Sequence, residues 1–295
     1  MAKLQQRRRY QGFYITNGIL LIIGATTMLA PVLHIIAQSF SSSTAILSGR
    51  VTVFPIGFTT IAYRRLVTGT PVVRSFMNSV QITVIGTAIN LLFSVLAAYP
   101  LSRPYFYGRR FLSLAMVFTM IFGGGLIPSF LLVRGLGLTN SYFAIWLPGL
   151  VSVYLIMILR TYFEGIPQSL DEASRIDGAT ELQLLLRVYL PLAVPAIAAL
   201  ALFYSVSNWN VFRQVLLYIS DSSKQNLNVL VRTLIRSQLL LEEATRVDPG
   251  ESMELSAPES VRAAGIVVLV LPVMMIYPFL QKHFVKGVLL GSIKG

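Results

Sequence analysis

The sequence contains no cysteine, which excludes disulfide bonds and thiolate metal sites. Histidine is nearly absent as well, since His34 and His283 are the two present and are too few for a histidine-based metal cluster. The chain also lacks a phosphate-binding Gly-x-x-x-x-Gly-Lys motif and a nucleophile elbow. We therefore expect no metal site, no bound cofactor and no catalytic residue in this chain.

Charged residues are scarce too, at 12% of the chain against roughly a quarter in an ordinary soluble domain. Six stretches contain no Lys, Arg, Asp or Glu at all: 13–49, 75–102, 111–133, 135–159, 188–212 and 263–281. The shortest has 19 residues, close to the roughly 20 that a helix needs to cross the hydrocarbon core of a bilayer. The composition therefore predicts an all-α membrane protein with six transmembrane helices.

The spacing of these stretches predicts the order of spans and connections. A six-span transmembrane domain, 13–282, is expected between an N-terminal segment, 1–12, and a C-terminal tail, 283–295. We expect the spans near 13–36, 75–101, 111–132, 140–160, 191–212 and 263–281. The connections are then an external segment, 37–71, an inside turn, 103–110, a cytoplasmic loop, 161–190, and an outside region, 213–260.

The net charge of +12 could suggest a nucleic-acid partner, but the basic residues lie at the ends of apolar runs, as topology signals do. If both termini are cytoplasmic, 13 of the 24 Lys and Arg lie inside and 11 outside, so the total count barely decides the orientation. The triplet Arg7–Arg9 before the first span and Arg109–Arg110 in a very short loop favour both termini inside. We therefore expect contact with membrane lipid and none with nucleic acid.

The cytoplasmic loop has readable local signals. Ser169 and Glu172 have the spacing of a capping box at the start of a helix. Gly178 can end that helix in the left-handed conformation, and Thr180 can begin a second one. Pro191 then bends the chain into the fifth span. The loop is predicted to form a short helix, a sharp turn and a second helix at the inner face of the membrane.

Such a hairpin could simply lie on the lipid surface. Its first helix is acidic, however, since Asp171, Glu172 and Asp177 are opposed only by Arg175. Anionic lipids of the inner leaflet would repel that face. The charge pattern favours a protein partner.

The same segment resembles the signature loop of binding-protein-dependent ABC importer permeases, which have a MetI-like transmembrane fold. The family pattern is Glu-Ala-Ala, three residues, Gly, nine residues and Ile-x-Leu-Pro. The matching residues here are Glu172-Ala173-Ser174, Gly178 and Val188-Tyr189-Leu190-Pro191, together with Asp177-Gly178-Ala179. Ser174 and Val188 depart from the pattern by small changes in volume.

The resemblance implies that this loop contains a coupling helix, which docks on an ATP-binding subunit. The implied docking residues are Asp171, Glu172, Ala173, Asp177, Gly178 and Ala179, with Leu190 and Pro191 joining the loop to the fifth span. ATP and Mg²⁺ would bind to that partner and not to this chain. The implied partners are a second homologous permease subunit, two ATP-binding subunits and an extracytoplasmic sugar-binding protein, assembled at the bacterial cytoplasmic (inner) membrane.

Further segments resemble the carbohydrate-uptake branch of that family, nearest to permeases for oligosaccharides of plant or algal polysaccharides. These segments are 46–59 with Tyr63, Asn78-Ser79, Trp209-Asn210 and the C-terminal 287–295. Asn226-Leu227-Asn228 departs from the Pro-Leu-Gln that the branch has at this point. The resemblance implies transport of sugars.

Amide, hydroxyl and aromatic groups bind sugars, and the candidate substrate-path residues are Asn78, Tyr204, Asn208, Trp209 and Asn210. Tyr204 and Asn208 are one helical turn apart and share a face. The alternative is an interfacial belt, because Trp and Tyr are enriched at membrane surfaces.

Three other features have simpler readings. Gly123–Gly125 indicates close packing or a kink, and His34 is expected to be a satisfied interior side chain. The outside residues Arg64, Arg65 and Arg74 could attract an acidic sugar or contact a binding protein.

The rival function is a secondary transporter or channel that works without ATP. Such proteins usually carry a charged residue inside the membrane for coupling, and the six predicted spans contain none. The sequence therefore favours one subunit of an ATP-driven importer that works by alternating access.

Overall fold

The computed structural model describes residues 2–247 and 258–292, and every regular element in those ranges is a helix. The chain divides into two compact units, one of Met1–Val72 with Val231–Leu271 and the other of Val73–Leu230 with Pro272–Gly295. The expected all-α class is confirmed for the described residues. The boundaries expected for the transmembrane domain and the two terminal segments stay predictions.

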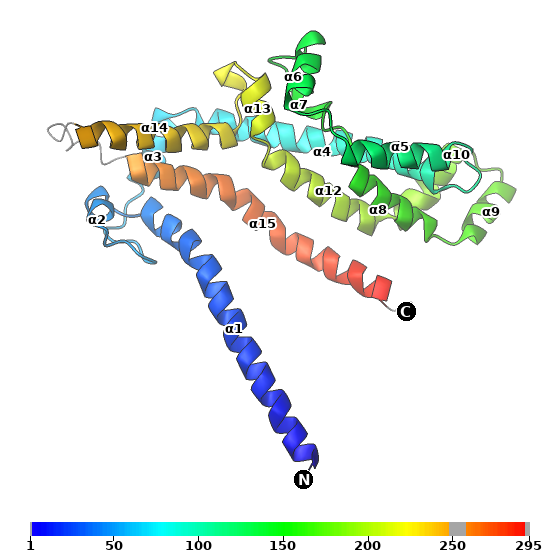
Figure 1. The fold of residues 1–295 in the computed structure, drawn as a ribbon, viewed down its shortest axis with the longest axis horizontal. Coiled ribbons are helices and arrows are strands. Elements are labelled where there is room, and N and C mark those ends of the chain that lie inside the picture. Colours follow the sequence, from blue (N-terminus) through cyan, green and yellow to red (C-terminus); the bar gives the residue numbers. More distant parts are fainter. Residues whose placement is uncertain (1, 248–257, 293–295) are drawn as a thin grey trace. The chain divides into compact units, whose positions relative to one another are not determined.

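The first unit begins with the long helix α1, Ala2–Ser39, which is drawn in blue in Figure 1. Two short helices follow, α2, Ser43–Leu47, and α3, Ile61–Gly69. The unit is completed by most of α14, Leu227–Val247, and by the first part of α15, Pro258–Ser292. The His34 ring is hydrogen-bonded at Nδ1 to the Thr52 carbonyl (2.7 Å) and at Nε2 to the Gln38 amide (3.0 Å). This confirms that the histidine is satisfied, but its side chain is half-buried and not interior.

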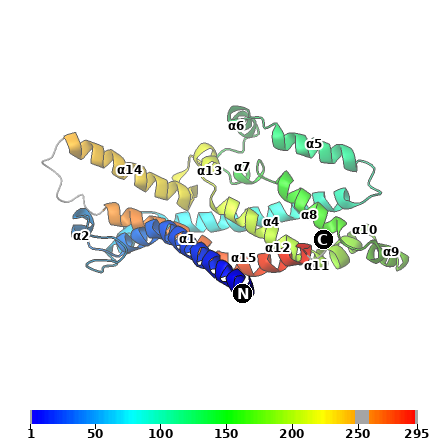
Figure 2. The same ribbon diagram turned by 60° about the horizontal axis from the view of Figure 1, so that its bottom comes forward.

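The second unit contains the elements on which function is argued below. In chain order they are α4 (Val72–Ser102), α5 (Arg109–Ile121), α6 (Leu126–Gly135), α7 (Phe143–Trp146), α8 (Val153–Glu164), α9 (Gln168–Ile176), α10 (Glu181–Leu184), the π-helix η1 (Leu185–Tyr189), α11 (Leu190–Leu192), α12 (Val194–Trp209), α13 (Arg213–Tyr218) and the 3₁₀ turn η2 (Ser222–Lys224). Helix α8 lies beside both α5 and α12 (Figure 2).

Three described helical segments are long and apolar enough to cross a membrane: Phe13–Ser39, Val72–Ser102 and Glu259–Ile276. Two bent helix pairs raise that number to as many as five. One pair is α5 with α6, bent by 112°, and the other joins Glu181–Leu192 to α12 with a bend of 81°. Six separate spans are therefore not established by helix length and composition.

A continuous helix over 111–132 is wrong, because α5 ends at Ile121 and α6 begins at Leu126. The three consecutive glycines Gly123–Gly125 lie in the break, and Gly125 has φ +81°, a conformation that an L side chain rarely adopts. Glycine also disfavours helix because its free backbone loses more entropy on ordering. The kink that these glycines indicate is thus confirmed.

A continuous helix over 140–160 is also wrong. Helix α7 ends at Trp146, and α8 begins only at Val153. Pro148 and Gly149 lie in the gap, where proline has no backbone N–H to donate and glycine weakens helix. The carbonyls exposed in such a gap need other donors if they lie in a membrane.

An apolar core holds α4, α8, η1 and α12 together. Its largest fully buried members are Tyr189, Phe163, Ile156, Leu159, Leu184 and Leu200. The rings of Tyr99, Phe163 and Tyr189 meet edge to face, with centroids 5.4–6.3 Å apart. This core fixes the loop 161–190 at one end and a polar cleft further along α4 and α12.

Candidate functional site

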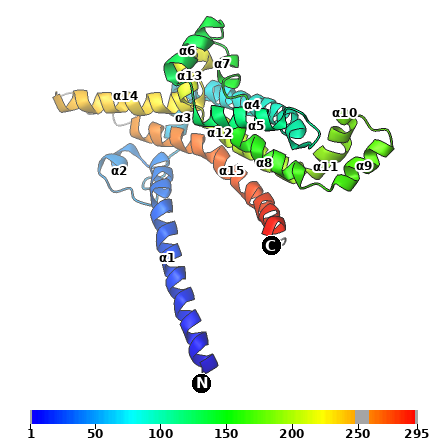
Figure 3. The ribbon, with the colours of Figure 1, turned by 45° about the vertical axis from the view of Figure 1, so that its right-hand side comes forward.

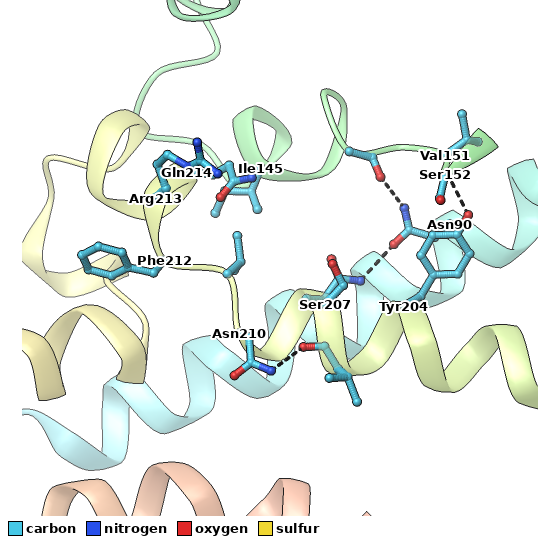
Figure 4. Close-up of a pocket in the computed structure, with 14 residues that line it drawn as sticks. Asn90, Ile145, Val151, Ser152, Tyr204, Ser207, Asn210, Phe212, Arg213 and Gln214 are labelled. Carbon is cyan, nitrogen blue, oxygen red and sulfur yellow. Dashed lines mark hydrogen bonds between the residues drawn. The ribbon is translucent and has the colours of Figure 1, made fainter. Parts of the chain in front are cut away.

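A polar cleft of about 770 Å³ opens where α4, α12, α13 and the connection between α7 and α8 meet (Figure 4). Its volume falls within the roughly 300–1,000 Å³ of small-molecule sites. The lining contains amides, hydroxyls and one cation, contributed by Asn90, Ser152, Tyr204, Ser207, Asn208, Asn210, Arg213 and Gln214. None of the described residues that line it carries a carboxylate.

Asn90 holds the non-helical connection between α7 and α8 in place. Its amide Nδ2 donates to the carbonyls of Gly149 and Leu150, at 2.8 Å each. Its Oδ1 accepts from Asn208 Nδ2 on α12, at 2.9 Å. One side chain of α4 thus satisfies two carbonyls that the broken helix leaves without intrahelical partners, which explains how this gap can be stable.

Tyr204 closes one end of the cleft. Its side chain is buried, and its hydroxyl lies 2.7 Å from Ser94 Oγ on α4 and accepts from the Ser152 backbone N–H at 3.0 Å. The predicted pairing of Tyr204 with Asn208 on one face of α12 is confirmed, since both line the cleft. Both are also committed to hydrogen bonds within the protein, so they shape the cleft wall.

A close approach of α4 to α12 sets the position of Asn208. A Cβ atom placed on Gly86 would lie 2.9 Å from Asn208 Nδ2 and 3.1 Å from Trp146 Cδ1, so no larger residue fits there without displacement. The sequence analysis missed Gly86 and Asn90. A lone amide within the charge-free run 75–102 was the available signal for Asn90.

Arg213 and Gln214 project from the start of α13 at the opposite end of the cleft from Asn90 and Tyr204 (Figure 4). Both side chains are exposed, and Arg213 has no ion-pair partner among the described residues. Sequence reasoning missed Arg213 because a basic residue directly after an apolar run resembles a topology signal. The cleft therefore has a polar neutral end and a cationic end.

The other predicted substrate-path residues are placed as follows. Asn210 lines the cleft, and its Nδ2 donates to the Val206 carbonyl at 2.9 Å. Asn78 instead donates to the carbonyls of Ser223 and Gln225, at 2.9 Å each, and so fixes the segment after α13. Trp209 is buried edge to face against Phe76, with centroids 5.8 Å apart. Of the five, Tyr204, Asn208 and Asn210 come together at the cleft, whereas Asn78 and Trp209 do not line it.

The loop 161–190 forms the expected helix, turn and helix, which lie together beyond the end of α8 (Figure 3). Gly178 has φ +77°, which confirms the left-handed stop after α9. Thr180 caps α10 in a capping box with Gln183, where Thr180 N donates to Gln183 Oε1 at 2.9 Å. The predicted cap at Ser169 is wrong, because α9 begins at Gln168 after Pro167, and proline favours the start of a helix.

The predicted docking residues form an exposed surface at α9 and the turn after it. Glu172, Ala173, Asp177 and Gly178 are exposed, and Asp171 and Ala179 are half-buried. Beside them Ile176 is 86% exposed, so this polar loop also presents a large apolar side chain to its surroundings. A surface that is both acidic and apolar is more typical of a site that contacts another protein than of one that faces water.

The Glu181 carboxylate contacts three polar side chains next to α9 and α10. It accepts hydrogen bonds from Tyr99 (2.9 Å) and Tyr105 (3.0 Å) and pairs with Arg175. Burial raises the pKa of the Glu181 carboxyl, but the hydrogen bonds from Tyr99, Arg175 and Tyr105 outweigh burial and leave that pKa lowered. Burial and the neighbouring Glu181 raise the pKa of the Tyr105 hydroxyl. At neutral pH this cluster is therefore a carboxylate held by neutral phenols and a guanidinium.

Leu190 and Pro191 form α11, the short link between the π-helix η1 and α12. The chain bends by 81° between the segment that ends at Leu192 and α12. A proline in this place cannot donate the backbone hydrogen bond of a straight helix. The predicted bend of the chain just after Pro191 is thus confirmed.

Comparison with known proteins gives consistent matches over most of the chain. The family described as "Binding-protein-dependent transport system inner membrane component" matches residues 79–290. The polygalacturonan/rhamnogalacturonan transport system permease protein YtcP of Bacillus subtilis is 40% identical over 280 residues, covering 94% of this chain and 96% of its own length. Protein LplC of the same organism is 40% identical over 275 residues, covering 92% and 91%.

A solved structure is similar as well. It is described as a bacterial ABC transporter involved in the import of the acidic polysaccharide alginate. The matched chain has a TM-score of 0.84 and 36% sequence identity, covering 93% of this chain and 97% of that chain.

Proposed function

Because the chain belongs to the family of binding-protein-dependent transport system inner membrane components, we propose that it forms half of the pathway of an ATP-driven oligosaccharide importer. The chain is a non-catalytic membrane subunit of an ABC transporter. Transport proceeds by alternating access, and a separate subunit that binds ATP and Mg²⁺ drives it.

The observation that carries the proposal is the polar cleft between α4, α12 and α13. Sugars are bound through hydroxyl hydrogen bonds, and the cleft offers the amides of Asn210 and Gln214 with the hydroxyls of Ser152 and Ser207. Asn90 keeps the wall of the cleft open at the break between α7 and α8. The permease YtcP, a relative that spans nearly the whole chain, is named for polygalacturonan and rhamnogalacturonan transport.

Arg213 favours oligosaccharides that carry carboxylates. Within the described part of the chain it is the one charged residue that lines the cleft, where no acidic side chain opposes it. A guanidinium binds a carboxylate through two parallel hydrogen bonds, whereas a neutral sugar gains less from it. The structurally similar transporter imports an acidic polysaccharide. Uronate oligosaccharides are therefore the proposed substrate class.

The six-span topology with both termini in the cytoplasm fits the helices if α5 with α6 forms one span and α7 with α8 another. The three long helical segments, these two spans and α12 then give six. The loop 161–190 then lies in the cytoplasm, where its exposed acidic and apolar surface docks on the ATP-binding subunit. Asp171, Glu172, Ala173, Asp177, Gly178 and Ala179 form the docking surface, and Leu190 and Pro191 connect it to α12.

The complete importer contains a second homologous permease subunit, two ATP-binding subunits and an extracytoplasmic sugar-binding protein. The family description names dependence on a binding protein. Its location is the cytoplasmic (inner) membrane of a bacterium.

The direct test is uptake by cells that lack this chain. Radiolabelled trigalacturonate and arabinotriose are supplied separately to the deletion strain and to the same strain that carries the gene again. We expect the deletion to abolish trigalacturonate uptake and complementation to restore it. Unchanged uptake of both sugars in the deletion strain would contradict the proposal, and loss of arabinotriose uptake alone would contradict the acidic substrate class.

A further inference from the structure

Arg103 is a buried cation at the cytoplasmic end of α4, directly after its last residue, Ser102. Its guanidinium lies 3.9 Å from the ring centre of Tyr189 and 4.8 Å from that of Tyr99. It donates from Nε and Nη2 to Ser102 Oγ at 3.1 and 3.0 Å, and from Nη1 to the Tyr189 hydroxyl. Nη1 also lies 3.6 Å from Asp171 Oδ2 on α9. One side chain therefore touches α4, α9 and η1.

Helix α9 contains no buried residue, so apolar packing does not anchor it. A hollow of about 200 Å³, lined among others by Ser102, Arg103, Asp171 and Glu172, lies beside its first turn. The ion pair between Arg103 and Asp171 crosses this region, and the side chains are only 6% and 14% exposed. Because the pair is shielded from water, it constrains the position of α9 more than a surface pair would.

A second route returns from α9 to the same end of α4. Asp171 also pairs with Arg175 at 3.4 Å, and Arg175 donates to the Tyr105 hydroxyl at 2.6 Å and to Glu181. Glu181 in turn accepts from the Tyr99 hydroxyl at 2.9 Å. Both routes from α9 thus reach the last turn of α4, through Arg103 and through Tyr99.

We propose that Arg103 is a positioning residue that carries the movement of α9 to the end of α4. The inference rests on the proposed role of the loop 161–190 in docking an ATP-binding subunit. When the partner displaces α9, Asp171 moves Arg103, and Arg103 moves the end of α4. Thirteen residues earlier, α4 carries Asn90, which holds the wall of the cleft, about 20 Å away at the rise of a helix. This route reaches the cleft separately from the direct chain connection through α11 into α12.

The test measures the ratio of sugar taken up to ATP hydrolysed by the complete complex in proteoliposomes, with trigalacturonate as probe. We expect Arg103→Gln to leave assembly and ATP hydrolysis intact and to lower that ratio at least tenfold. Arg103→Lys keeps the charge but loses the planar fork, so a smaller fall is expected. Arg110→Gln is the matched control, because Arg110 lies seven residues further on in the first turn of α5, is exposed and has no ion-pair partner in the described residues.

Non-additivity provides a second readout that a merely structural role would not give. If Arg103 acts through Asp171, the double variant Arg103→Gln with Asp171→Asn has the same low ratio as either single variant. Should the Arg103 variants fail to assemble, Tyr189→Phe removes only the hydroxyl that Arg103 contacts and is expected to lower the ratio a few-fold.

A ratio within twofold of the unaltered complex in Arg103→Gln or, where that variant does not assemble, in Tyr189→Phe would overturn the inference. That outcome leaves the proposed function standing, since the unaltered complex still couples uptake to ATP. Absence of ATP-dependent uptake by the unaltered complex would overturn both.

Discussion

At the scale of single residues, Asn90 and Arg213 give the two ends of the cleft different chemistry. Asn90 donates hydrogen bonds to the carbonyls of Gly149 and Leu150 and so fixes the neutral, polar end of the cleft. Arg213 lines the opposite end with an exposed guanidinium.

Arg213→Gln removes the cation at the open end of the cleft. A hydrogen bond to a charged group contributes about 1.5–3 kcal/mol, so the half-saturating concentration of trigalacturonate should rise roughly tenfold or more. Uptake is measured in the complemented deletion strain. Arg134→Gln, which removes an exposed arginine that does not line the cleft, is the control and should have no such effect. Equal losses in both variants would argue against a site at Arg213.

Gly86→Ala tests the close approach of α4 to α12. The added Cβ must displace Asn208, since it would lie 2.9 Å from Nδ2, and the bond from Asn208 to Asn90 should be lost. Loss of one such bond costs about 1 kcal/mol, so we expect a thermal midpoint a few degrees lower and weaker sugar affinity. Gly18→Ala in α1 has no atom within 4 Å of its Cβ and should keep both values. Identical behaviour of the two variants would refute the contact.

The sequence predicted single residues best where one residue determines its own backbone. Gly178 adopts φ +77° after α9, and Thr180 caps the next helix. Asn90 and Arg213 could not be assigned in the same way, because their roles depend on residues far along the chain. Asn90 is hydrogen-bonded to Gly149 and Leu150 across about 60 residues, and nothing local predicts that contact.

At the scale of elements, composition predicted where apolar segments lie but not where their helices break. The runs 111–133 and 135–159 are free of charge, yet the structure breaks both at glycine and proline. Hydropathy indicates which segments prefer lipid to water. Whether such a segment is one continuous helix depends on backbone conformation and on side-chain hydrogen-bond donors such as Asn90. The hairpin of α9 and α10 was predictable because its stop and its second cap are local in sequence. The predicted N-cap of α9 was Ser169, whereas the helix begins two residues earlier, directly after Pro167.

Substitution of Gly178 tests whether the turn after α9 must keep its shape. Nothing lies within 4 Å of a Cβ at this position, so only the positive φ penalises a side chain. Gly178→Val should therefore strain the turn by about 1–2 kcal/mol, leave membrane insertion intact and uncouple sugar uptake from ATP hydrolysis. Gly178→Asn should retain coupling, because asparagine tolerates the left-handed region. Normal uptake by the valine variant would show that the shape of the turn is dispensable.

At the scale of the whole molecule, the count of basic residues hardly determines the orientation in the membrane. Inside and outside basic residues number 13 and 11 in the predicted topology, so the balance is nearly even. The family match identifies a membrane subunit, and the side of the membrane on which the loop 161–190 lies is a separate question. Helix length alone gives three to five spans, because length measures straight helices and this chain contains bent ones.

Single-cysteine labelling can settle the orientation, since the chain contains no cysteine of its own. Two exposed positions suit the label. Tyr107 lies in the turn between α4 and α5, and Ser222 lies in the segment after α13, so the variants are Tyr107→Cys and Ser222→Cys. With a membrane-impermeant maleimide, we expect Tyr107→Cys to react in inside-out vesicles and Ser222→Cys in right-side-out vesicles. The reverse pattern would place the loop 161–190 outside and contradict the coupling role.

The central claim is that this chain moves sugar only when a partner hydrolyses ATP. The most direct measurement compares trigalacturonate uptake into proteoliposomes that contain the chain alone with uptake into those that contain the complete complex, its binding protein and ATP. The account predicts no uptake by the chain alone, with or without an ion gradient, and ATP-dependent uptake by the complex. Uptake by the chain alone, driven by a gradient and indifferent to ATP, would contradict it.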